Sequence, residues 1–351
     1  MFTKFFIRLF IFISLSLYSF ANECTDTDPN YKLSFPRDYG QHLQYGYDDW
    51  AFISYLTDIS NNIYMTQSRI MVFSNDCNYP SNTEIIFVST ITDVSNDIMY
   101  YQESMLLPTN DTIFKSKPVL LEINHSNYLR QLIDMVVYDY SITISSSSTL
   151  SVELIIPDNL LILKAGNNSI QKFANEYGVE YSQSTLETLK GSIKINDTTT
   201  PVTGYMIFNH IFMKPNPTTS HNIMYWTYLL FQYDNGYNLH VYIVKDINGK
   251  YMNESYLSLT NNVISIYLPY LTNQFTFNEK NQWISPNTNY TYTTEHLIDF
   301  DFNDTQISCK VLIQNNEIFG NNTYYEGGSI STLMMSNITS NGYGTTRIGY
   351  E

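Results

Sequence analysis

The stretch Phe35–Phe52, which reads FPRDYGQHLQYGYDDWAF, decides the fold of this chain. It places arginine, aspartate and histidine side chains among many aromatic ones, a mixture that surface loops rarely contain. Buried aromatic rings and polar groups held by partners would accommodate both kinds of side chain. The stretch is therefore predicted to be a lead-in whose last part enters a β-barrel.

The N-terminus has the pattern of a secretory signal peptide. Lys4 and Arg8 come before the apolar run Leu9–Phe20, and Ser19–Ala21 has the small residues of a cleavage site. The run is shorter than the roughly 18 apolar residues of a membrane span. Residues 1–21 are therefore predicted to be a signal peptide, with the mature protein secreted or in the lumen of the secretory pathway. An uncleaved anchor is the alternative.

Acidic residues dominate the charge of the chain: 33 Asp and Glu face 18 Lys and Arg, and the formal net charge is −15. This field would repel nucleic acid and anionic membrane surfaces, so neither is expected as a partner. After the signal peptide, no segment is long and apolar enough to span a membrane. A neutral, cationic or apolar small molecule is compatible with the charge, although acidity also serves solubility alone.

The cysteines outside the signal peptide are Cys24, Cys77 and Cys309. In an oxidising compartment one pair could bridge and leave one thiol over, but spacing does not select the pair. So few cysteines do not make a disulfide scaffold, and a hydrophobic core must hold the fold. Asn-x-Ser/Thr sequences are about as frequent as chance predicts. The expectation of a glycoprotein therefore follows from the signal peptide and not from their number.

Short β-rich runs separated by Asn, Asp, Gly, Ser and Pro clusters predict an all-β fold. The runs are Ile63–Phe73, Glu84–Val94, Val119–Ile123, Ser151–Ile156, Met206–Phe212, Met224–Tyr233, Leu239–Val244 and Thr305–Ile313. Asn235-Gly236 and Asn248-Gly249 lie between runs, and such pairs favour type I′ hairpins because both central residues tolerate positive φ. We expect a three-stranded meander of Met224–Tyr233, Leu239–Val244 and Tyr251–Leu259.

One segment departs from this pattern. Its apolar residues recur at helical spacing: Leu129, Leu132, Ile133, Val136 and Val137. With Ser126 and Asn127 as candidate caps, the spacing predicts a helix of about three turns.

The length of the chain favours two domains after the signal peptide. The strand pattern starts again near Tyr181–Ile195, and Thr199-Thr200-Pro201 follows as a loop. The domain boundary is therefore expected at about residue 185.

The opening stretch resembles the first motif of the double-lipocalin family that includes carotenoid 1,2-hydratases, AttH-like proteins and fungal Diels–Alderase-type cyclases. That motif reads F-P-x-D-x-G-x-H, a short spacer and E-W-W-[YF]. Its first part is matched by Phe35, Pro36, Asp38, Gly40 and His42. In its second part Trp50 and Phe52 match, whereas Asp49 stands for the Glu and Ala51 replaces the second Trp.

Further segments resemble the family in the same order along the chain. Tyr181-Ser182 with Leu189–Ile193 resembles the join between its two halves. Gly204–Phe212 stands where the family has G-x-x-W-x-D-H-E-W. Near the end, Tyr324–Gly327 resembles Y-W-E-G, and Gly342–Glu351 resembles the G-Y-x-E-x-x-G-Y terminus. The resemblance therefore covers almost the whole chain after the signal peptide.

This resemblance implies two lipocalin-like (calycin) antiparallel β-barrels packed together, an N-terminal domain at 22–185 and a C-terminal domain at 186–351. A barrel of about eight strands encloses space for one small ligand when side chains do not fill it. Trp226 and Tyr228 share one face of the predicted strand Met224–Tyr233. That face either lines a ligand pocket or belongs to a filled core.

His210 is the first catalytic candidate, because it matches the His of the D-H-E-W motif. Hydration or cyclisation of a polyene needs an acid and groups that stabilise a developing cation. Around His210, however, Asn209 replaces the Asp, Ile211 the Glu and Phe212 the Trp, which argues against hydratase activity. A core histidine with satisfied hydrogen bonds is the alternative.

Glu326 is the second catalytic candidate, as an acid whose pKa is raised in an aromatic setting. The alternative is a structural carboxylate bonded to backbone or to Arg37. The residues expected to bind ligand are Asp38, His42, Asp49, Trp50, Trp226, Tyr228 and Tyr325. No cofactor is expected, and no metal, since the six His show no ligand spacing such as H-x-x-x-H.

The expected function is binding of a hydrophobic small molecule, such as a lipid, an isoprenoid or a polyketide-like compound, by a secreted two-barrel protein. The 31 Tyr and 20 Phe supply apolar walls with polar tips, although biased composition alone could explain them. One alternative is a cyclase, isomerase or hydratase that acts on a polyene by acid catalysis. Another is a structural or cell-surface glycoprotein with filled barrels. The oligomeric state stays open.

Overall fold

A computed structural model describes residues 24–35, 37–74, 77, 83–106, 112–116, 119–123, 131–134, 140–145, 150–156, 160–173, 176–185, 188–214, 223–270, 273–318 and 323–350. The predicted signal peptide lies outside these residues. Within the described part of the chain, no helix is long and apolar enough to cross a membrane.

Strands make up almost all of the regular structure. The first half contains β1 Tyr47–Thr57, β2 Ile63–Ser74, β3 Thr83–Asp93, β4 Ile98–Leu106, β5 Thr112–Ser116, β6 Val119–Ile123, β7 Gln131–Asp134, β8 Tyr140–Ser145, β9 Leu150–Ile156, β10 Leu160–Lys164, β11 Ile170–Phe173, β12 Glu176–Thr185, β13 Leu189–Ile195 and β14 Thr198–Met213. The second half contains β15 Ile223–Tyr233, β16 Asn238–Asp246, β17 Tyr256–Thr260, β18 Ser265–Pro269, β19 Phe275–Glu279, β20 Gln282–Ile284, β21 Thr291–Thr293, β22 Glu295–Phe300, β23 Thr305–Val311, β24 Glu317–Ile318, β25 Tyr324–Met335 and β26 Ile338–Tyr350. The helices of the described residues are the 3-10 turns η1 Arg37–Tyr39, η2 Leu43–Tyr45 and η5 Phe302–Asp304.

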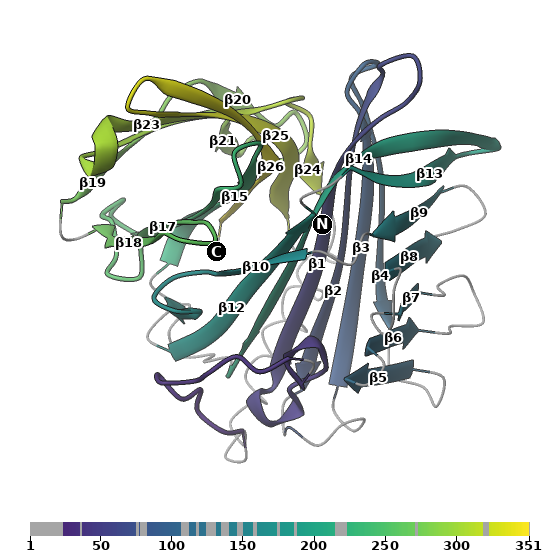
Figure 1. Ribbon diagram of the computed structural model, residues 1–351, viewed down its shortest axis with the longest axis horizontal. Coiled ribbons are helices and arrows are strands. Elements are labelled where there is room, and N and C mark those ends of the chain that lie inside the picture. Colours follow the sequence, from purple (N-terminus) through teal and green to yellow (C-terminus); the bar gives the residue numbers. More distant parts are fainter. Residues whose placement is uncertain are drawn as a thin grey trace, which may run out of the picture.

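The first sheet is antiparallel and has 12 strands, in the order β4-β3-β2-β1-β14-β13-β9-β8-β7, with β10, β11 and β12 off this path. The strand β14 organises it. One edge of β14 pairs with the whole of β1, while the other edge pairs first with β13 and then with β12. The sheet curves into a half-barrel (Figure 1).

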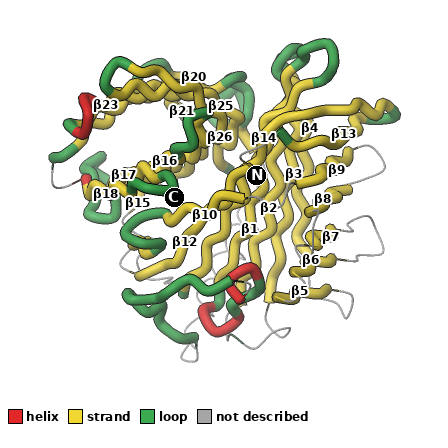
Figure 2. Tube along the Cα trace, in the orientation of Figure 1, coloured by secondary structure: helices red, strands yellow, loops and turns green. Residues whose placement is uncertain are grey.

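The second sheet has 10 strands, in the order β18-β17-β16-β15-β26-β25-β23-β22-β19, with β24 beside β25. It curls into a nearly closed ring beside the half-barrel, and Figure 2 shows that the regular structure of both units is almost entirely strand. The predicted all-β architecture of two packed lipocalin-like barrels is confirmed.

Each barrel has its own hydrophobic core. Trp50, Phe52 and Phe208 are buried in the core of the first barrel, and Leu229 and Phe231 in that of the second. Because side chains alternate along a strand, the next residues point out of each barrel. Where the barrels meet, Ile53 and Ile207 pack against Tyr228 and Leu230, with Trp226 beside them. Trp226 and Tyr228 therefore do share one face, as predicted, and that face meets the first barrel.

The predicted strands and hairpins are present. All eight β-rich runs overlap strands, and β15, β16 and β17 form the expected meander. The turn type differs from the prediction: Gly236 (φ 82°) and Gly249 (φ 74°) are left-handed, but Asn235 and Asn248 are not. The Gly236 amide donates to the Tyr233 carbonyl at 3.0 Å. These are therefore three-residue turns closed by a left-handed glycine.

The helix predicted around Leu129–Val137 is wrong where the structure describes it, because Gln131–Asp134 is strand β7, paired with β8. Leu132 and Ile133 are good strand formers as well as helix-compatible residues, and pairing with β8 satisfies their backbone. The rest of that segment lies outside the described residues.

The change from one sheet to the next comes later in the chain than the expected domain boundary near residue 185. β13 and β14 still pair within the first sheet, whose last strand ends at Met213, and the second sheet begins at Ile223. The long-range pairing of β14 with β1 draws this segment back to the first barrel.

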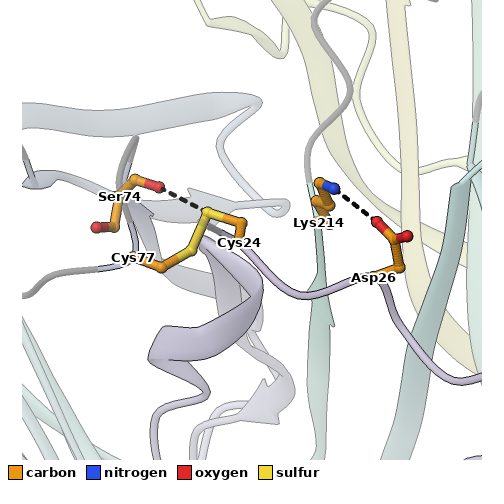
Figure 3. The surroundings of a disulfide bond; sticks show 5 residues. All are labelled: Cys24, Asp26, Ser74, Cys77 and Lys214. Carbon is orange, nitrogen blue, oxygen red and sulfur yellow. Dashed lines mark hydrogen bonds and ion pairs between the residues drawn. A yellow bond between two sulfur atoms is a disulfide. The ribbon is translucent and has the colours of Figure 1, made fainter. Parts of the chain in front are cut away.

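Residues 24–46, called the lead-in segment below, precede β1, and Figure 3 shows two of the points that tie them to the first barrel. Cys24 and Cys77 form a disulfide with a Cα–Cα distance of 5.4 Å, and Cys309 is free and buried. The Asp26 carboxylate pairs with Lys214 at 2.6 Å, just after β14. The structure thus selects one of the cysteine pairs that spacing left open.

Candidate functional site

The facing surfaces of the two sheets are ordered in rows, because residues opposite each other in antiparallel strands point to the same side. In β1 and β14, Asp49 lies opposite Ile211, and Ala51 opposite Asn209. The next rows are Ile53 with Ile207 and Tyr55 with Tyr205. Along this surface, the first two rows each contain one polar residue, the third row is apolar and the fourth is aromatic.

The aromatic rows border an open cleft of about 100 Å³ between the sheets. Tyr55 and Tyr205 line it from the first sheet, and Gln232 and Tyr343 from the second. The rings of Tyr55 and Tyr343 stack with centroids 3.9 Å apart. The Gln232 side chain is buried, and its Oε1 has no hydrogen-bond partner. The cleft therefore offers stacked rings and one unused acceptor.

Beyond the cleft lies a buried polar group of side chains, called the inter-sheet cluster below. Its members are Asp49, Gln67, Arg69, Gln171, Glu180, Ser182, Asn209, Tyr228, His240, Tyr256, Glu326 and Arg347. Ile53 and Ile207 form the inner wall of the cleft, and the first polar row, at Ala51 and Asn209, is two residues further, or about 7 Å.

Glu180 is the centre of one half of this cluster. Its Oε1 accepts hydrogen bonds from Asn209 Nδ2 at 3.1 Å and from the Tyr228 hydroxyl. Its Oε2 accepts from Gln171 Nε2 and lies 3.4 Å from the Tyr256 hydroxyl, whose nearer acceptor is Gln171 Oε1. No Lys or Arg of the described residues forms an ion pair with this fully buried carboxylate.

His240 lies beside Glu180, with Nδ1 3.6 Å from Glu180 Oε1. The Ser182 hydroxyl donates to Asn209 Oδ1 at 3.2 Å, so it must accept from His240 Nε2 at 2.8 Å. Burial alone would raise the pKa of Glu180, but His240 and the bonds from Tyr228 and Asn209 outweigh it and lower that pKa. Burial, together with the Glu180 charge, raises the pKa of Tyr228 well above its ordinary value. Glu180 is therefore an ionised carboxylate, and Tyr228 is a neutral phenol that donates to it.

The other half of the cluster holds two ion pairs, Asp49 with the partly buried Arg69 and Glu326 with the buried Arg347. Arg69 binds Asp49 with both Nε and Nη2, at 2.9 and 2.5 Å. Arg347 Nε lies 2.5 Å from Glu326 Oε1 as an ion pair, and this oxygen accepts a hydrogen bond from Gln67 Nε2. Glu326 Oε2 and Arg347 Nη2 have no hydrogen-bond partner. The Arg347 guanidinium lies 5.6 Å from the centre of the Tyr228 ring, so this residue joins the two halves.

A second polar group, called the lead-in cluster, is enclosed where the lead-in segment covers the first barrel. Its members are Asp38, His42, Asp48, Tyr181 and His210, all buried. Asp48 Oδ1 lies 3.2 Å from His42 Nδ1 and 3.0 Å from His210 Nε2. Asp38 Oδ1 lies 3.3 Å from His42 Nε2. The Tyr181 hydroxyl donates to the Asp38 carbonyl at 2.6 Å.

Aromatic rings enclose this cluster. The Trp50 ring stacks on His210 at 4.8 Å, and the Phe212 ring on His42 at 3.6 Å. Burial alone would raise the pKa of both carboxyl groups, Asp38 and Asp48. For Asp38 the hydrogen bonds from His42 and Arg37 outweigh burial and lower its pKa. For Asp48 those from His210 and His42 do the same. Burial also opposes protonation of His42, but the two carboxylates raise its pKa. Burial lowers the pKa of His210.

Comparison with known proteins fits this architecture. A family model described as AttH-like matches residues 26–346. The chain belongs to the AttH-like family. No curated protein sequence matches this AttH-like chain.

Solved structures share its fold. It is similar to a putative AttH from Nitrosomonas europaea, with a TM-score of 0.75, 15% identity, and coverage of 92% of this chain and 98% of that one. It is also similar to kievitone hydratase from Nectria haematococca, with a TM-score of 0.70, 13% identity, and coverage of 94% of this chain and 97% of that one. For CghA the TM-score is 0.53 and the identity 9%, with coverage of 87% of this chain and 88% of that one. The family and these neighbours support the two-barrel fold.

The structure does not bring the two catalytic candidates together. His210 belongs to the lead-in cluster and Glu326 to the inter-sheet cluster, on opposite faces of the first sheet. Glu326 is bonded to Arg347 and not to Arg37, which pairs with Asp38.

The expected ligand-binding residues are divided in the same way. Asp49, Tyr228 and Trp226 lie between the sheets. Asp38 and His42 belong to the lead-in cluster, and Trp50 packs against it. Tyr325 points away from Glu326 into an aromatic group with Tyr292, and donates to the Ile313 carbonyl at 2.9 Å.

Sequence reasoning missed Glu180, Arg347, Arg69 and Asp48. Glu180 directly precedes Tyr181-Ser182, which was singled out only as part of the join between the halves. Its signal is a carboxylate in the interior of strand β12, between Val179 and Tyr181. Arg347 carries a comparable signal as a charged residue inside the terminal strand β26.

Proposed function

We propose that this protein binds a small, largely apolar molecule in the cleft between its two sheets. The observation that carries the proposal is the combination of stacked tyrosine rings with the unused acceptor of Gln232. Tyrosine rings stack on flat or unsaturated ligands, and one fixed acceptor would orient a hydroxyl or N–H group.

The cleft sets a limit on ligand size. Its volume of about 100 Å³ is smaller than the roughly 300 Å³ of an ordinary ligand pocket. It would hold one ring, or the end of an elongated isoprenoid or polyketide-like compound whose remainder stays outside. The acidic chain favours a neutral or cationic compound over an anion.

Binding can be tested by native mass spectrometry of purified protein, alone and with a panel of isoprenoids, fatty acids and aromatic polyketides. We expect one ligand per chain, with affinity reduced at least tenfold in Tyr343→Ala and in Gln232→Leu. Tyr290→Ala, which truncates a half-exposed tyrosine outside the cleft, is the matched control. If no apolar compound binds across the panel, or if all three variants bind alike, the proposal fails.

Secretion is part of the proposal and rests on the signal-peptide pattern of residues 1–21. Expression of the full chain in a secretory host should give protein in the medium whose N-terminus begins close to Asn22. Retention of Met1 in the secreted or cell-bound product would contradict it.

A second candidate function is acid-catalysed isomerisation, cyclisation or hydration of a polyene. The inter-sheet cluster favours it, because Glu180 is a buried carboxylate with no Lys or Arg partner among the described residues. Such a charge would stabilise a carbocation formed nearby. Protonation of an alkene carbon, by Glu326 in its carboxylic acid form or by His240 in its imidazolium form, would create that cation and leave the carboxylate or the neutral imidazole behind. Loss of another proton, or attack by water followed by loss of its proton, would then remove it, either directly or after ring closure has moved the charge to another carbon.

Product analysis separates the two functions. Catalysis predicts turnover of a bound polyene that falls at least a hundredfold in Glu180→Gln and in Glu326→Gln while binding in the cleft persists. His210→Ala tests the family motif, and its effect should be smaller if the chemistry lies between the sheets. If every ligand that binds is recovered without any product, the catalytic function is contradicted and only the binding function remains.

A further inference from the structure

The lead-in cluster brings three metal-ligating side chains to one point. His42 comes from the lead-in segment, Asp48 from the start of β1 and His210 from β14. One ligand atom of each lies within 4.8 Å of the others, and all three residues are buried. None of the distances along the sequence is a metal-ligand spacing, so the site exists only in the folded chain.

The hydrogen bonds of His210 do not balance. Nδ1 lies 3.1 Å from the Asp38 carbonyl oxygen, and Nε2 lies 3.0 Å from Asp48 Oδ1. Both oxygens are acceptors, whereas a neutral imidazole has a single N–H. The Tyr181 hydroxyl lies 2.6 Å from the same Asp38 carbonyl and 3.3 Å from His210 Nδ1, and its single hydrogen is directed to the nearer oxygen. A neutral His210 therefore leaves one nitrogen lone pair facing an oxygen lone pair.

The same count applies to His42. Its Nδ1 faces Asp48 Oδ1 at 3.2 Å, and its Nε2 faces Asp38 Oδ1 at 3.3 Å. Together the two rings turn four nitrogens toward oxygen acceptors, but two neutral rings carry only two hydrogens. Two hydrogens, each with its positive charge, are missing from the arrangement. When the two hydrogens present are on the outer nitrogens, His42 Nε2 and His210 Nδ1, both missing contacts are made with the same atom, Asp48 Oδ1.

One divalent cation supplies both charges at that position. The outer nitrogens, His42 Nε2 and His210 Nδ1, then donate their hydrogens to the carboxylate and the carbonyl of Asp38. The inner nitrogens, with Asp48 Oδ1, are left as three lone-pair donors. Histidine ligands of metals usually donate the other ring N–H to a carboxylate or a carbonyl in this way.

We propose that His42 Nδ1, Asp48 Oδ1 and His210 Nε2 bind one divalent transition-metal ion of the zinc class. Two nitrogens and one oxygen suit zinc better than magnesium or calcium, which take oxygen ligands. Zinc bonds of about 2.0–2.1 Å at tetrahedral angles put neighbouring ligand atoms roughly 3.4 Å apart. The present separations from Asp48 Oδ1, 3.0 and 3.2 Å, need to widen by only a few tenths of an ångström.

The site is enclosed on both sides, and this determines how an ion would enter it. Trp50 and Phe212 close it on the barrel side, and the lead-in segment on the other. The ion would be captured as the lead-in segment closes, so its binding would contribute to folding. The alternative occupant is a pair of protons, which makes both rings imidazolium.

The test is the metal content and thermal stability of the purified full chain. Protein from zinc-supplemented cells should hold about one zinc per chain, and cobalt-grown protein should show the visible absorption of four-coordinate Co²⁺. Chain unfolded with a chelator, its disulfide intact, should regain a higher Tm when it is refolded with Zn²⁺ than without. His42→Gln, Asp48→Asn and His210→Gln should each hold at least tenfold less metal.

His296→Gln is the matched control, because His296 is a buried histidine of the second barrel outside this cluster. It should keep the metal content of the wild type and the same response to Zn²⁺. The wild-type measurements do not depend on whether the variants fold. Purified and refolded wild type without bound metal, with a Tm that Zn²⁺ leaves unchanged, would overturn the proposal and favour the two protons. Metal retained in all three variants would overturn it as well.

Discussion

Glu180 on β12 lies directly opposite Ile211 on β14, and its carboxylate points to the same side of the sheet. Asp49 on β1 lies opposite Ile211 from the other edge. The family motif has a Glu at the position of Ile211. In this chain, the carboxylates of the two neighbouring strands flank that position instead. Loss of the acid from the motif therefore does not leave the inter-sheet surface without one.

Glu180→Gln should destabilise the protein. An amide replaces one acceptor oxygen by a donor, so bonds from Gln171, Asn209, Tyr228 or Tyr256 are lost inside the cluster. Hydrogen bonds to a buried carboxylate suggest a loss of roughly 2–4 kcal/mol, measured by urea unfolding. Glu153→Gln, at an exposed position of β9, should stay within about 0.5 kcal/mol of the wild type. Equal midpoints for the two variants would refute this role.

The disulfide should contribute a large part of the stability of the lead-in segment. It closes a loop with a sequence separation of 53 residues. The chain-entropy model then gives about 4 kcal/mol for replacing Cys24 and Cys77 by Ser, measured as the free energy of unfolding. A reducing agent should lower the stability of the wild type and leave the double variant unchanged. Cys309→Ala keeps the bridge and serves as control; reduction without effect on the wild type would contradict the assignment.

Gly46→Ala should be more harmful than the same change at Gly236. Both glycines have φ 82°, so both variants carry the strain of a left-handed alanine, about 1 kcal/mol. A methyl group at Gly46 would also lie 2.8 Å from the Ser74 carbonyl and close to the sulfurs of the disulfide, whereas at Gly236 it meets nothing within 4 Å. The difference between the two variants in thermal unfolding isolates that contact. Equal losses would show that the lead-in segment shifts without cost.

His296 should make the second barrel sensitive to acid. Burial lowers its pKa to about 3, below the ordinary value of 6.5. Between these two values the unfolded chain binds a proton that the folded chain does not. The free energy of unfolding is therefore highest above pH 6.5 and decreases as the pH falls toward 3. His296→Phe should flatten the dependence of the unfolding free energy on pH in that window. Parallel pH profiles for wild type and variant would show that the buried imidazole is not the cause.

The sequence predicted the fold better than the site, and alternation along strands explains why. Asp48 and Asp49 are adjacent in the opening motif, but Asp48 points into the lead-in cluster and Asp49 into the inter-sheet cluster. Tyr325 and Glu326 are separated in the same way. A motif read as one site thus supplies two sites on opposite faces of a sheet.

Glu180 shows what a linear pattern cannot contain. Its partners Tyr228 and Tyr256 come from the other barrel, and their approach depends on how the two sheets pack. Hairpins, by contrast, are local, so Asn235-Gly236 predicted β15 and β16 correctly. The contact between His42 and His210 is also long-range, since these residues meet only through the pairing of β1 with β14.

That pairing has a consequence for how the protein is made. Tyr47 at the start of β1 pairs with Met213, and Tyr225 near the start of β15 pairs with Tyr350. In both sheets the first strand is completed by the last one. On the ribosome, β1 therefore exposes a bare hydrogen-bonding edge until nearly the whole first barrel has been synthesised. Each barrel closes late, and a chain that stops before β14 or β26 leaves an edge open to aggregation.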